Sequence, residues 1–439
     1  MNTVRAGLEY LGKLTPWNGR GGFALQYITA VLKRLGNPQD ALPTVHIAGT
    51  NGKGSVSSAV SSILGAAGYR VGLNVSPHLQ VMNERLVVDG LPVPDEFLGE
   101  FALEVRNAAA KELVELSFHE AITAVAFLGF RESGCEWAVI EVGLGGRLDA
   151  SNVITRPAAT AIVTIDYDHQ AILGNSLGEI AAEKAGIVKP ATPLVSGHLP
   201  KEAADVVARK AVGVPLLKFG RDYGARELTG ADASGFGYWD KTLGSGVGDL
   251  FQYSTPLPGI HQGHNMAVAI KLGLTVGMNP EVCKAGVEGV FWPGRLERVD
   301  TMGRAFVIDC AHNTAGIAAF ISFLQSNGLK DIDLTFGVLD TKNWQAMVQA
   351  LRPHVRTWRL LRPDSERALP VETLRSEIGV SGTGVRVLGY GSDYERCLRE
   401  AIDENDGQPA FVTGSMYMVG KLRGMLSVPT KPLWKRVVK

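Results

Sequence analysis

The chain has 439 residues, of which 45% are hydrophobic, and its 44 Lys and Arg residues balance its 44 Asp and Glu residues. This length predicts roughly two or three domains, and the zero net charge argues against nucleic acid or an anionic membrane as the main partner. Four cysteines without a C-x-x-C pair make a disulfide framework or a zinc site unexpected. No apolar run reaches the roughly 18 residues of a membrane span, and the first residues lack the apolar core of a secretion signal. We therefore expect a cytoplasmic protein.

The first half of the chain alternates strand-like and helix-like segments. The run TVHIAG at 44–49 predicts a short buried strand, which a predicted helix at 53–68 and a second strand at 69–77 follow. Strand, loop, helix and strand in this order predict parallel pairing. Further strands are expected at 136–143, 159–166 and 192–197, and helices at 96–111, 120–131, 177–189 and 265–278. Strands that are apolar throughout suit a sheet buried on both faces.

The segment 221–254 has a different character, because it is rich in Gly, Asp, Thr and aromatic residues and lacks a helical period. It predicts antiparallel hairpins or a long insertion. The composition around 291–300 suggests a domain boundary, after which strand-like and helix-like segments alternate again. We therefore predict an α/β protein with two domains. These are an N-terminal phosphate-loop domain with a mainly parallel sheet, at 1–295, and a smaller C-terminal Rossmann-like α/β domain, at 296–439.

The stretch AGTNGKGS lies between the first predicted strand and the first predicted helix, where a phosphate-binding loop would lie. The usual pattern places the hydroxyl residue directly after the lysine, whereas here Gly54 follows Lys53 and Ser55 comes one place later. Glycines let backbone N–H groups point into one hollow at the positive end of the helix dipole. Lys53 would supply a charge for the phosphates, and Ser55 or Thr50 a hydroxyl. An ordinary glycine-rich turn is the alternative, but the coincidence of these features favours a nucleotide site. Its residues are Gly49, Thr50, Asn51, Gly52, Lys53, Gly54 and Ser55.

Polar residues also follow three other predicted strands. In a doubly wound sheet, ligands bind at the carboxyl ends of the strands, and a divalent cation that accompanies phosphate prefers oxygen ligands. Any one of these residues alone would be interpreted as a loop residue that bonds to the backbone. Three such strand ends beside a phosphate loop instead predict a metal site. The residues are Glu141 after one strand, Asp166, Asp168 and His169 after the next, and Ser76 and His78 after the second.

A series of short motifs then covers nearly the whole chain, from about residue 35 to residue 420. In order they are VHIAGTNGKGS, SPHL, EVGLGGRLDA, DHQAILG, EKAGIVK, HQGHN, PGRLE and DCAHN, with VTGSMYMVG near the end. Together they resemble the folylpolyglutamate synthase and dihydrofolate synthase branch of the Mur ligase superfamily.

The resemblance implies an ATP-dependent ligase that joins an acid to an amino acid. ATP would phosphorylate a carboxylate to an acyl phosphate, which the amine of L-glutamate attacks, so that ADP and phosphate are released. The acceptor would be dihydropteroate, the γ-carboxyl of a reduced folate that already carries glutamate, or both. The partners would be these small molecules, without nucleic acid or membrane, and we expect a monomer.

The resemblance also implies roles for single residues in two magnesium sites. Ser76 and Glu141 would bind one Mg²⁺, and His169 the other. Lys184, which composition alone would make a surface lysine, matches a lysine that carbon dioxide carbamylates and that thereby becomes a metal ligand. The residues expected to act in catalysis are Lys53, Lys184, His169 and His312. The two histidines are candidates for the base that deprotonates glutamate, although a metal ligand is poorly suited to that role.

The remaining implied contacts concern the nucleotide and the pterin. Gly52, Lys53, Gly54 and Ser55 would hold the ATP phosphates, while Asn265, Arg295, Asp309 and His312 complete the nucleotide site, which would lie between the domains. Segments at 23–26, 118–120 and 148–150 match regions that line the pterin pocket of the family, although Phe118 could equally belong to the core. The expected substrate-binding residues are Phe118, Glu120, Leu148, Asp149, Ala150, Ser415 and Tyr417. The chain departs from the family pattern at Cys310, usually glycine, and at His119, commonly aromatic.

Two other functions stay open at this point. The motifs do not separate the folate enzymes, bifunctional or polyglutamylating only, from a Mur-type ligase that acts on another carboxylate. A phosphate-loop switch ATPase without a ligation step is a third possibility. It is disfavoured, because a switch needs neither a second α/β domain with its own nucleotide contacts nor a lysine at position 184.

Overall fold

The computed structural model describes residues 2–15, 25–228, 235–243, 248–301, 303–379 and 385–437. The chain forms two compact units, of which the first comprises Met1–Pro256, Gln262–Phe291 and Lys431–Lys439 and the second Leu257–His261 and Trp292–Thr430. The predicted division after residue 295 differs from this one, chiefly because the C-terminal segment belongs to the first unit. There Leu433 N donates to Gly90 O at 2.7 Å, and Phe291 N donates to Leu433 O at 2.8 Å. The described part of this segment, residues 431–437, forms no helix or strand, so no hydrophobic period in the sequence indicated that it packs on the first unit.

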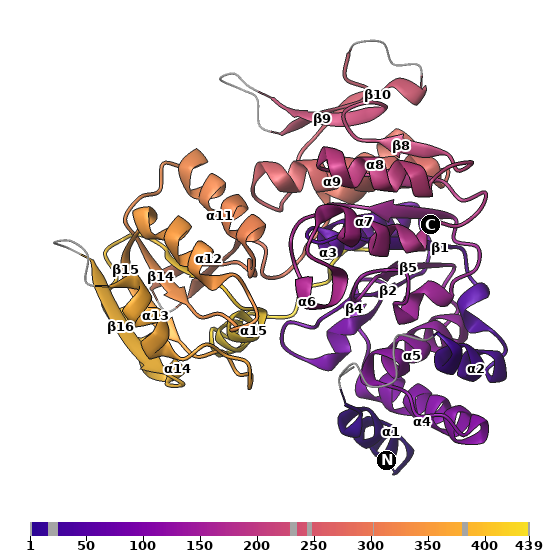
Figure 1. Cartoon of the computed structure of the whole chain (residues 1–439), viewed down its shortest axis with the longest axis horizontal. Coiled ribbons are helices and arrows are strands. Elements are labelled where there is room, and N and C mark those ends of the chain that lie inside the picture. Colours follow the sequence, from indigo (N-terminus) through magenta and orange to yellow (C-terminus); the bar gives the residue numbers. More distant parts are fainter. Residues whose placement is uncertain are drawn as a thin grey trace. The chain divides into compact units, whose positions relative to one another are not determined.

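The first unit is built on an eight-stranded sheet (Figure 1). The strand order is β4-β3-β2-β5-β1-β6-β7-β8. The six strands β2, β5, β1, β6, β7 and β8 are parallel to one another. At the edge of the sheet, β3 pairs antiparallel with β2, and β4 with β3. The bounds are β1 Thr44–Ala48, β2 Val71–Asn74, β3 Leu86–Val88, β4 Leu91–Pro92, β5 Trp137–Glu141, β6 Ala159–Ile162, β7 Leu194–Ser196 and β8 Leu216–Lys218. The predicted strands are confirmed, but β1 and β2 do not pair directly, because β5 lies between them.

Helices cover both faces of this sheet, with α3 and α5 on opposite sides of β2 and β5 (Figure 1). The helix bounds are α1 Asn2–Lys13, α2 Gln26–Arg34, α3 Lys53–Ala66, α4 Asp95–Glu112, α5 Phe118–Glu132, α6 Gln170–Leu173, α7 Leu177–Lys184, α8 Lys201–Lys210, α9 Ile260–Thr275 and α10 Pro280–Glu288. Helix α3 is buried almost all round, because its small serines and Gly65 let α10 and the C-terminal Trp434 approach closely. The start of α3 is therefore held in place by close packing along the helix.

The segment predicted to form hairpins folds as a three-stranded antiparallel sheet, β11-β10-β9. Its strands are β9 Tyr223–Glu227, β10 Phe236–Asp240 and β11 Phe251–Tyr253. A buried ion pair links it to α9, because Lys271 Nζ lies 2.8 Å from Asp240 Oδ2. Tyr253 also donates to Gly263 O at 2.6 Å. The insertion thus fixes α9 within the first unit.

The second unit is a smaller α/β structure, which confirms the predicted fold class. Its strand order is β12-β13-β17-β14-β15-β16, parallel except for the edge strand β12, which the sequence did not reveal. Helices α11 to α13 pack on one face, and α14 and α15 contact strands β15 to β17. The bounds are β12 Glu297–Thr301, β13 Arg304–Ile308, β14 Ile332–Phe336, β15 Val355–Leu361, β16 Arg386–Gly391, β17 Ala410–Thr413, α11 Thr314–Ser326, α12 Trp344–Leu351, α13 Val371–Ile378, α14 Tyr394–Asp403 and α15 Met416–Met425.

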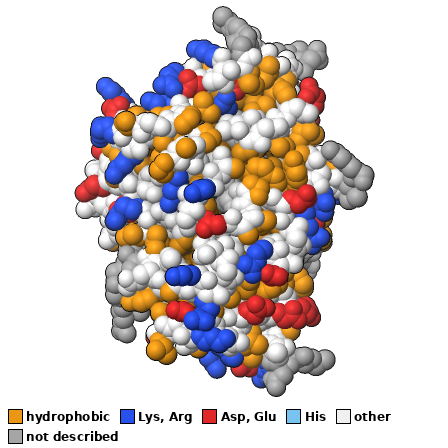
Figure 2. All heavy atoms as spheres, turned by 90° about the vertical axis from the view of Figure 1, so that its right-hand side faces the viewer, with side chains coloured by type: hydrophobic (Ala, Val, Ile, Leu, Met, Phe, Trp, Pro, Cys, Tyr) orange, Lys and Arg blue, Asp and Glu red, His pale blue; other side chains and the backbone are white. Residues whose placement is uncertain are grey.

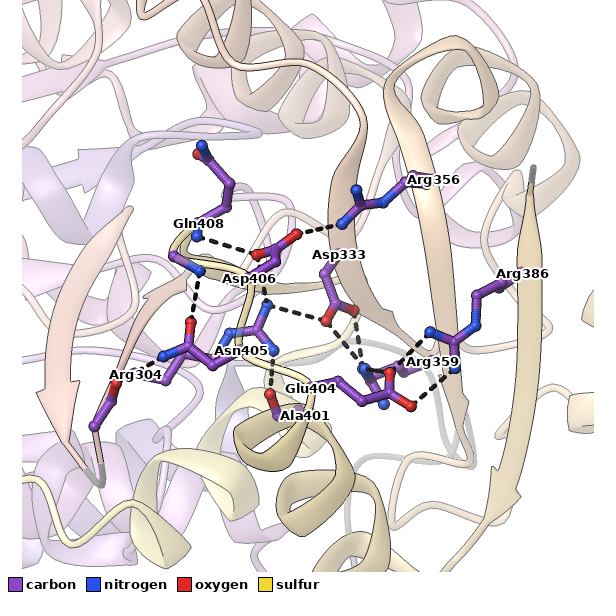
Figure 3. Close-up of polar contacts among 12 residues, drawn as sticks. Arg304, Asp333, Arg356, Arg359, Arg386, Ala401, Glu404, Asn405, Asp406 and Gln408 are labelled. Atoms are coloured by element: carbon purple, nitrogen blue, oxygen red, sulfur yellow. Dashed lines mark hydrogen bonds and ion pairs between the residues drawn. The ribbon is translucent and has the colours of Figure 1, made fainter.

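A network of ion pairs lies between this second sheet and the end of α14 (Figure 3). Arg359 donates from Nε and Nη2 to both oxygens of Asp333, at 2.9 and 3.1 Å, and Nη2 also reaches Glu404 at 2.7 Å. Arg304 lies 3.1 Å from Asp333 and donates to the carbonyl oxygen of Ala401. Each buried arginine is therefore matched by carboxylate or carbonyl oxygens.

Charges of both signs are interspersed among the described side chains of the face that Figure 2 shows, in keeping with the zero net charge. Within the described part of the chain, no helix combines the length and the apolar character that crossing a bilayer demands.

Candidate functional site

The phosphate loop of the first unit connects β1 to α3 in a conformation that requires glycine. Gly52 caps α3 with φ +80°, and a Cβ at this position would lie 2.7 Å from Asn265 Oδ1 and 3.0 Å from Val163 Cγ1. Any larger residue would therefore be strained and would clash with α9. Asn265, itself buried, lies directly beside the loop, as the sequence predicted for a nucleotide-binding position.

The loop is anchored on the end of β6 through residues whose role the sequence did not reveal. Thr164 Oγ1 accepts from Asn51 N and donates to Asn51 O, both at 2.9 Å. The Thr50 hydroxyl accepts from Asp166 N at 3.0 Å and donates to Asp166 O at 3.2 Å. Thr50 is thus occupied in holding the loop, which leaves Ser55 as the hydroxyl for a phosphate. The sequence feature that could have indicated this role for Thr164 is its position just after strand β6.

Ser55 lies in the first turn of α3 with only 1% of its surface exposed. Its Oγ has no hydrogen-bond partner within the described residues. Buried hydroxyls usually find a partner, so one without any needs a reason. At the N-terminal end of a helix, where backbone N–H groups also point outward, a bound anion would supply that partner.

Two lysines converge on this loop. Lys53 Nζ donates to Gly49 O at 3.0 Å, and Lys184 Nζ, from the end of α7, donates to the same oxygen at 2.9 Å. Among the described residues, neither forms a salt bridge with a carboxylate. Lys184 is only 5% exposed, and burial, followed by the charge of Lys53, lowers the pKa of Lys184 to about 7. A buried amine and a half-buried one, neither in a salt bridge within the described residues, form a place for an anion.

The predicted metal ligands lie at the carboxyl ends of three parallel strands of the first sheet, β2, β5 and β6, of which β2 and β5 are neighbours. Ser76 follows β2, Glu141 ends β5 and is 4% exposed, and His169 follows β6. The His169 side chain is 48% exposed and its backbone is left-handed at φ +52°. In the described ranges, no three His, Cys, Asp or Glu side chains gather closely enough to hold a metal ion. A metal at this edge would therefore depend on other donors, such as a hydroxyl, a phosphate or a modified lysine.

Several of the predicted pterin-binding residues of the first unit already contact other residues of the protein. Glu120 accepts from Ser117 N at 2.9 Å and from Ser117 Oγ at 2.8 Å, which forms a capping box for α5. Phe118 packs against the core while the Arg85 guanidinium lies 5.0 Å from its ring centre. Leu148 is half-buried and Ala150 is buried. In the predicted segment 23–26, residues 23 and 24 lie outside the described residues.

Asp149 is the centre of a buried hydrogen-bond network. It accepts from Leu144 N, Ser151 N and His119 Nε2, each at 3.0 Å, and Ser151 Oγ lies 2.8 Å from His46 Nε2. Burial opposes the charge of Asp149, but His119 and the other donors lower the pKa of this carboxyl well below its usual range. Burial also lowers the pKa of His119, yet Asp149 outweighs it and raises that pKa. The unusual residue at position 119 is thus an imidazole held by an aspartate.

In the second unit, the predicted nucleotide residues lie in two loops that bond to each other. Cys310 N donates to Gly294 O at 2.9 Å, next to Arg295. Asp309 accepts from Leu296 N at 3.0 Å and from Ala311 N at 2.9 Å. Burial raises the pKa of Asp309 even though Arg295 lies near it.

His312 and the loop before α15 lie at the same edge of the second sheet. His312 Nδ1 lies 2.9 Å from Cys310 O, and Gly414 N donates to Ala311 O at 2.9 Å. Ser415 is buried and its Oγ lacks a partner in the described structure, whereas Tyr417 is 48% exposed. The structure therefore brings the DCAHN and VTGS motifs together at the carboxyl ends of β13 and β17.

Cys310 is 3% exposed, and burial raises the pKa of its thiol to about 12. All four cysteines are free and buried. Cys310 is therefore a packed side chain and not a nucleophile.

Comparison with known proteins gives consistent matches over the two units. Residues 47–273 match the family model "Mur ligase middle domain", and residues 294–415 match "Mur ligase, glutamate ligase domain". A folylpolyglutamate synthase of Lacticaseibacillus casei is 34% identical, with 91% of this chain and 93% of that protein covered. A dihydrofolate synthetase of Saccharomyces cerevisiae is 32% identical, with coverage of 91% and 96%.

The solved structures agree with these relatives. The folylpolyglutamate synthase of Mycobacterium tuberculosis, solved with ADP, superposes with a TM-score of 0.85 at 28% identity. The superposition covers 98% of this chain and 99% of that one.

Proposed function

The chain belongs to the folylpolyglutamate synthase and dihydrofolate synthase family of Mur ligases and is an ATP-dependent ligase, and from this premise we propose its substrates and the work of its residues. We propose that it joins L-glutamate to dihydropteroate, to the γ-carboxyl of folate glutamates, or to both. The reaction proceeds through an acyl phosphate and releases ADP and phosphate. The proposal includes a monomer in the cytoplasm, as expected from the sequence.

The observation that carries the proposal is the pair of amines that share one carbonyl oxygen. Lys53 and Lys184 both donate to Gly49 O, inside a loop of glycines at the start of α3. This arrangement fits the phosphates of ATP, because it offers the Lys53 cation, the backbone N–H groups at the start of α3 and the hydroxyl of Ser55, which has no partner among the described residues. The residues proposed to hold the phosphates are Gly49, Asn51, Gly52, Lys53, Gly54 and Ser55.

The donors at the same strand ends suit magnesium in their chemistry. Ser76 and Glu141 provide oxygen atoms, which Mg²⁺ prefers, and we propose that they hold one ion and that His169 binds the second. Bound magnesium would neutralise charge that develops on the transferred phosphoryl group. Since three acidic or imidazole side chains do not gather in the described ranges, the nucleotide itself would supply further oxygens.

Carbamylation of Lys184 would remove the repulsion between this buried amine and the half-buried amine of Lys53. A lysine with a pKa of about 7 is partly neutral at physiological pH, and the neutral amine is the form that reacts. Its lone pair would form an N–C bond to carbon dioxide, with one proton released to solvent. The product is an anion that offers oxygen ligands beside Lys53. The burial of Lys184 and its position at the loop support this modification.

In the second unit, we propose that Arg295, Asp309 and His312 contact the nucleotide, together with Asn265 of the first unit. The hydrogen bond from His312 Nδ1 to Cys310 O would leave the lone pair on Nε2. We therefore favour His312 over the exposed His169 as the base that takes the proton from the glutamate ammonium.

For the acceptor, Phe118, Leu148, Asp149 and Ala150 are the proposed wall, with Ser415 and Tyr417 on the second unit. Asp149 and Glu120 act first as anchors, because their oxygens already accept hydrogen bonds within the protein. Their effect on the substrate would thus come through the neighbours that they hold, among them His119.

The test is a transfer assay. The protein is incubated with ATP, magnesium and labelled L-glutamate, and is offered dihydropteroate, tetrahydrofolate monoglutamate or a muropeptide precursor in turn. We expect labelled product with at least one folate substrate, and the pattern shows whether one or both activities are present. Labelling of the muropeptide precursor alone would contradict the proposal in favour of another Mur ligase. ATP hydrolysis without transfer would favour a switch ATPase.

A further inference from the structure

The loop that carries Arg295 is fixed by hydrogen bonds to its backbone on both sides. Gly294 N donates to Glu297 Oε2 at 2.9 Å, and Leu296 N donates to Asp309 Oδ2 at 3.0 Å. Arg295 thus sits between two backbone groups, each bonded to a buried carboxylate. The Arg295 guanidinium itself donates from Nη1 to Gly294 O at 3.1 Å, so its position follows that of a backbone held by these two carboxylates.

The backbone around Arg295 is not one that the sequence would adopt unaided. Leu296 has φ +49°, in the left-handed region that leucine rarely enters, and Gly294 has φ +68°. Such strain persists only where the surroundings over-determine the conformation, and it collects at ligand-binding sites. Something must therefore hold the Glu297 carboxylate firmly, since a mobile acceptor could not fix a strained loop.

Arg423, in the last turn of α15, holds that carboxylate. Its Nε and Nη2 donate to the two oxygens of Glu297, both at 2.9 Å. The two side chains are only 5% and 7% exposed. Oxygen Oε2 accepts from Arg423 and from Gly294 N at once. A planar guanidinium fixes both oxygens, whereas a lysine would fix only one.

We propose that Arg423 is a positioning residue, which acts through Glu297 and the loop backbone to aim Arg295 at the phosphates of a bound nucleotide. The inference rests on the proposed function in one respect, namely that Arg295 contacts nucleotide. It goes further because it attributes the position of Arg295 to the buried pair of Arg423 and Glu297. Neither of these two residues was predicted to bind a ligand.

The alternative hypothesis is that Arg423 and Glu297 only stabilise the second unit. The same unit contains a matched control for this hypothesis. Arg359 also donates from Nε and Nη2 to two oxygens of a buried carboxylate, that of Asp333, and its side chain is 1% exposed. It lies in the ion-pair network of Figure 3, which contains none of the predicted nucleotide residues. Replacing either arginine by lysine removes one bidentate pair from the same fold.

The experiment measures ADP binding by calorimetry, the KM for ATP and the unfolding temperature of four variants. They are Arg423→Lys, Arg359→Lys, Arg295→Ala and the double variant Arg295→Ala/Arg423→Lys. We expect Arg423→Lys to weaken ADP binding and raise the KM for ATP by at least about tenfold, with kcat less affected. Arg359→Lys should lower the unfolding temperature with nucleotide binding unchanged. In the Arg295→Ala background, Arg423→Lys should cause no further loss.

Three results would overturn the inference. They are unchanged ADP binding in Arg423→Lys, equal weakening in Arg359→Lys, and a full additional loss in the double variant. If the wild-type protein itself bound no ADP, the proposed function would fail, and this inference with it. If Arg423→Lys does not fold, Arg423→Met with Glu297→Gln removes both buried charges together, and the same loss of ADP binding is expected.

Discussion

Two sites, one in each unit, contain buried cations, and the partners of these cations differ between the sites. Between the second sheet and α14, Arg304 and Arg359 are matched by the carboxylates of Asp333 and Glu404. Arg304 also donates to a carbonyl oxygen, and Arg359 to the Tyr390 hydroxyl. At the phosphate loop, Lys53 and Lys184 share one carbonyl oxygen and have no carboxylate partner in the described structure.

The pKa shifts follow the same division. Burial opposes the charge of Arg359, but Asp333 and Glu404 outweigh it and raise the pKa of Arg359, while Arg386 and Arg359 lower the pKa of Glu404 to about 2. Burial and Lys53 instead lower the pKa of Lys184 to about 7. A cluster whose cations are paired with carboxylates stabilises the fold. A cluster of cations without carboxylate partners is suited to bind a ligand or to be modified.

The largest effect should come from Lys184→Ala. We expect ligase activity to fall below about a thousandth of the wild-type rate, with the unfolding temperature little changed, because the variant removes a buried amine that has no counter-ion. Short carboxylates such as acetate should restore part of the activity by replacing the carbamate. The measurements are initial rates with and without added carboxylate, and thermal unfolding.

Lys271→Ala is the control for that experiment, since Lys271 is equally buried but paired with Asp240. Its loss should lower the unfolding temperature, because the buried Asp240 carboxylate would lose its counter-ion and keep only neutral hydrogen-bond donors such as Tyr238 and Thr242. Full activity of Lys184→Ala would refute the catalytic role of the unbalanced lysine.

The opposite behaviour is expected of Arg359→Met. Removing this guanidinium leaves Asp333 without its bidentate partner, so the free energy of unfolding should fall by about 3–5 kcal/mol. The KM values and kcat of the folded enzyme should not change. Urea unfolding and steady-state kinetics check this, and a large rise in the KM for ATP would show that the network is not merely structural.

Much of the fold and the place of the phosphate loop could be predicted from the sequence, and the reasons are local. Short apolar runs predicted β1, β5 and β6, and a loop of glycines with Lys53 predicted the phosphate site. Parallel sheets place such strand ends along one edge, so Ser76 and Glu141 could be assigned to that edge in advance.

Pairing partners could not be predicted in the same way, because they depend on contacts between residues far apart in the chain. The bonds of Thr164 to Asn51, of Asp149 to His119 and of Arg423 to Glu297 have no periodicity. Glu120 looked like a substrate ligand, although its spacing from Ser117 also fits the capping box that it forms. The insertion of β5 between β1 and β2 was likewise invisible, since sequence order does not fix strand order.

Ser55→Ala should have a smaller effect, and only on ligand binding. The Ser55 hydroxyl has no partner in the described structure, so its removal should leave stability unchanged or slightly higher. If it bonds a phosphate, the KM for ATP should rise by about tenfold. Ser61→Ala is the matched control, because Ser61 Oγ is also buried and unpaired but lies farther along α3. Equal KM values in the two variants would mean that Ser55 does not touch the nucleotide.

The smallest expected effect concerns the acid stability of the paired cluster. The pKa of Glu404 is about 2 in the folded chain against an ordinary value of 4.5. A depressed pKa contributes stability above the ordinary value, and this contribution is lost as pH falls from about 4.5 towards 2. Glu404→Gln should therefore be less stable than wild type near neutral pH, and the difference should shrink as the solution is acidified. Urea midpoints between about pH 6 and pH 3 measure it. A constant difference would place the stabilisation in the shape of the side chain and not in its charge.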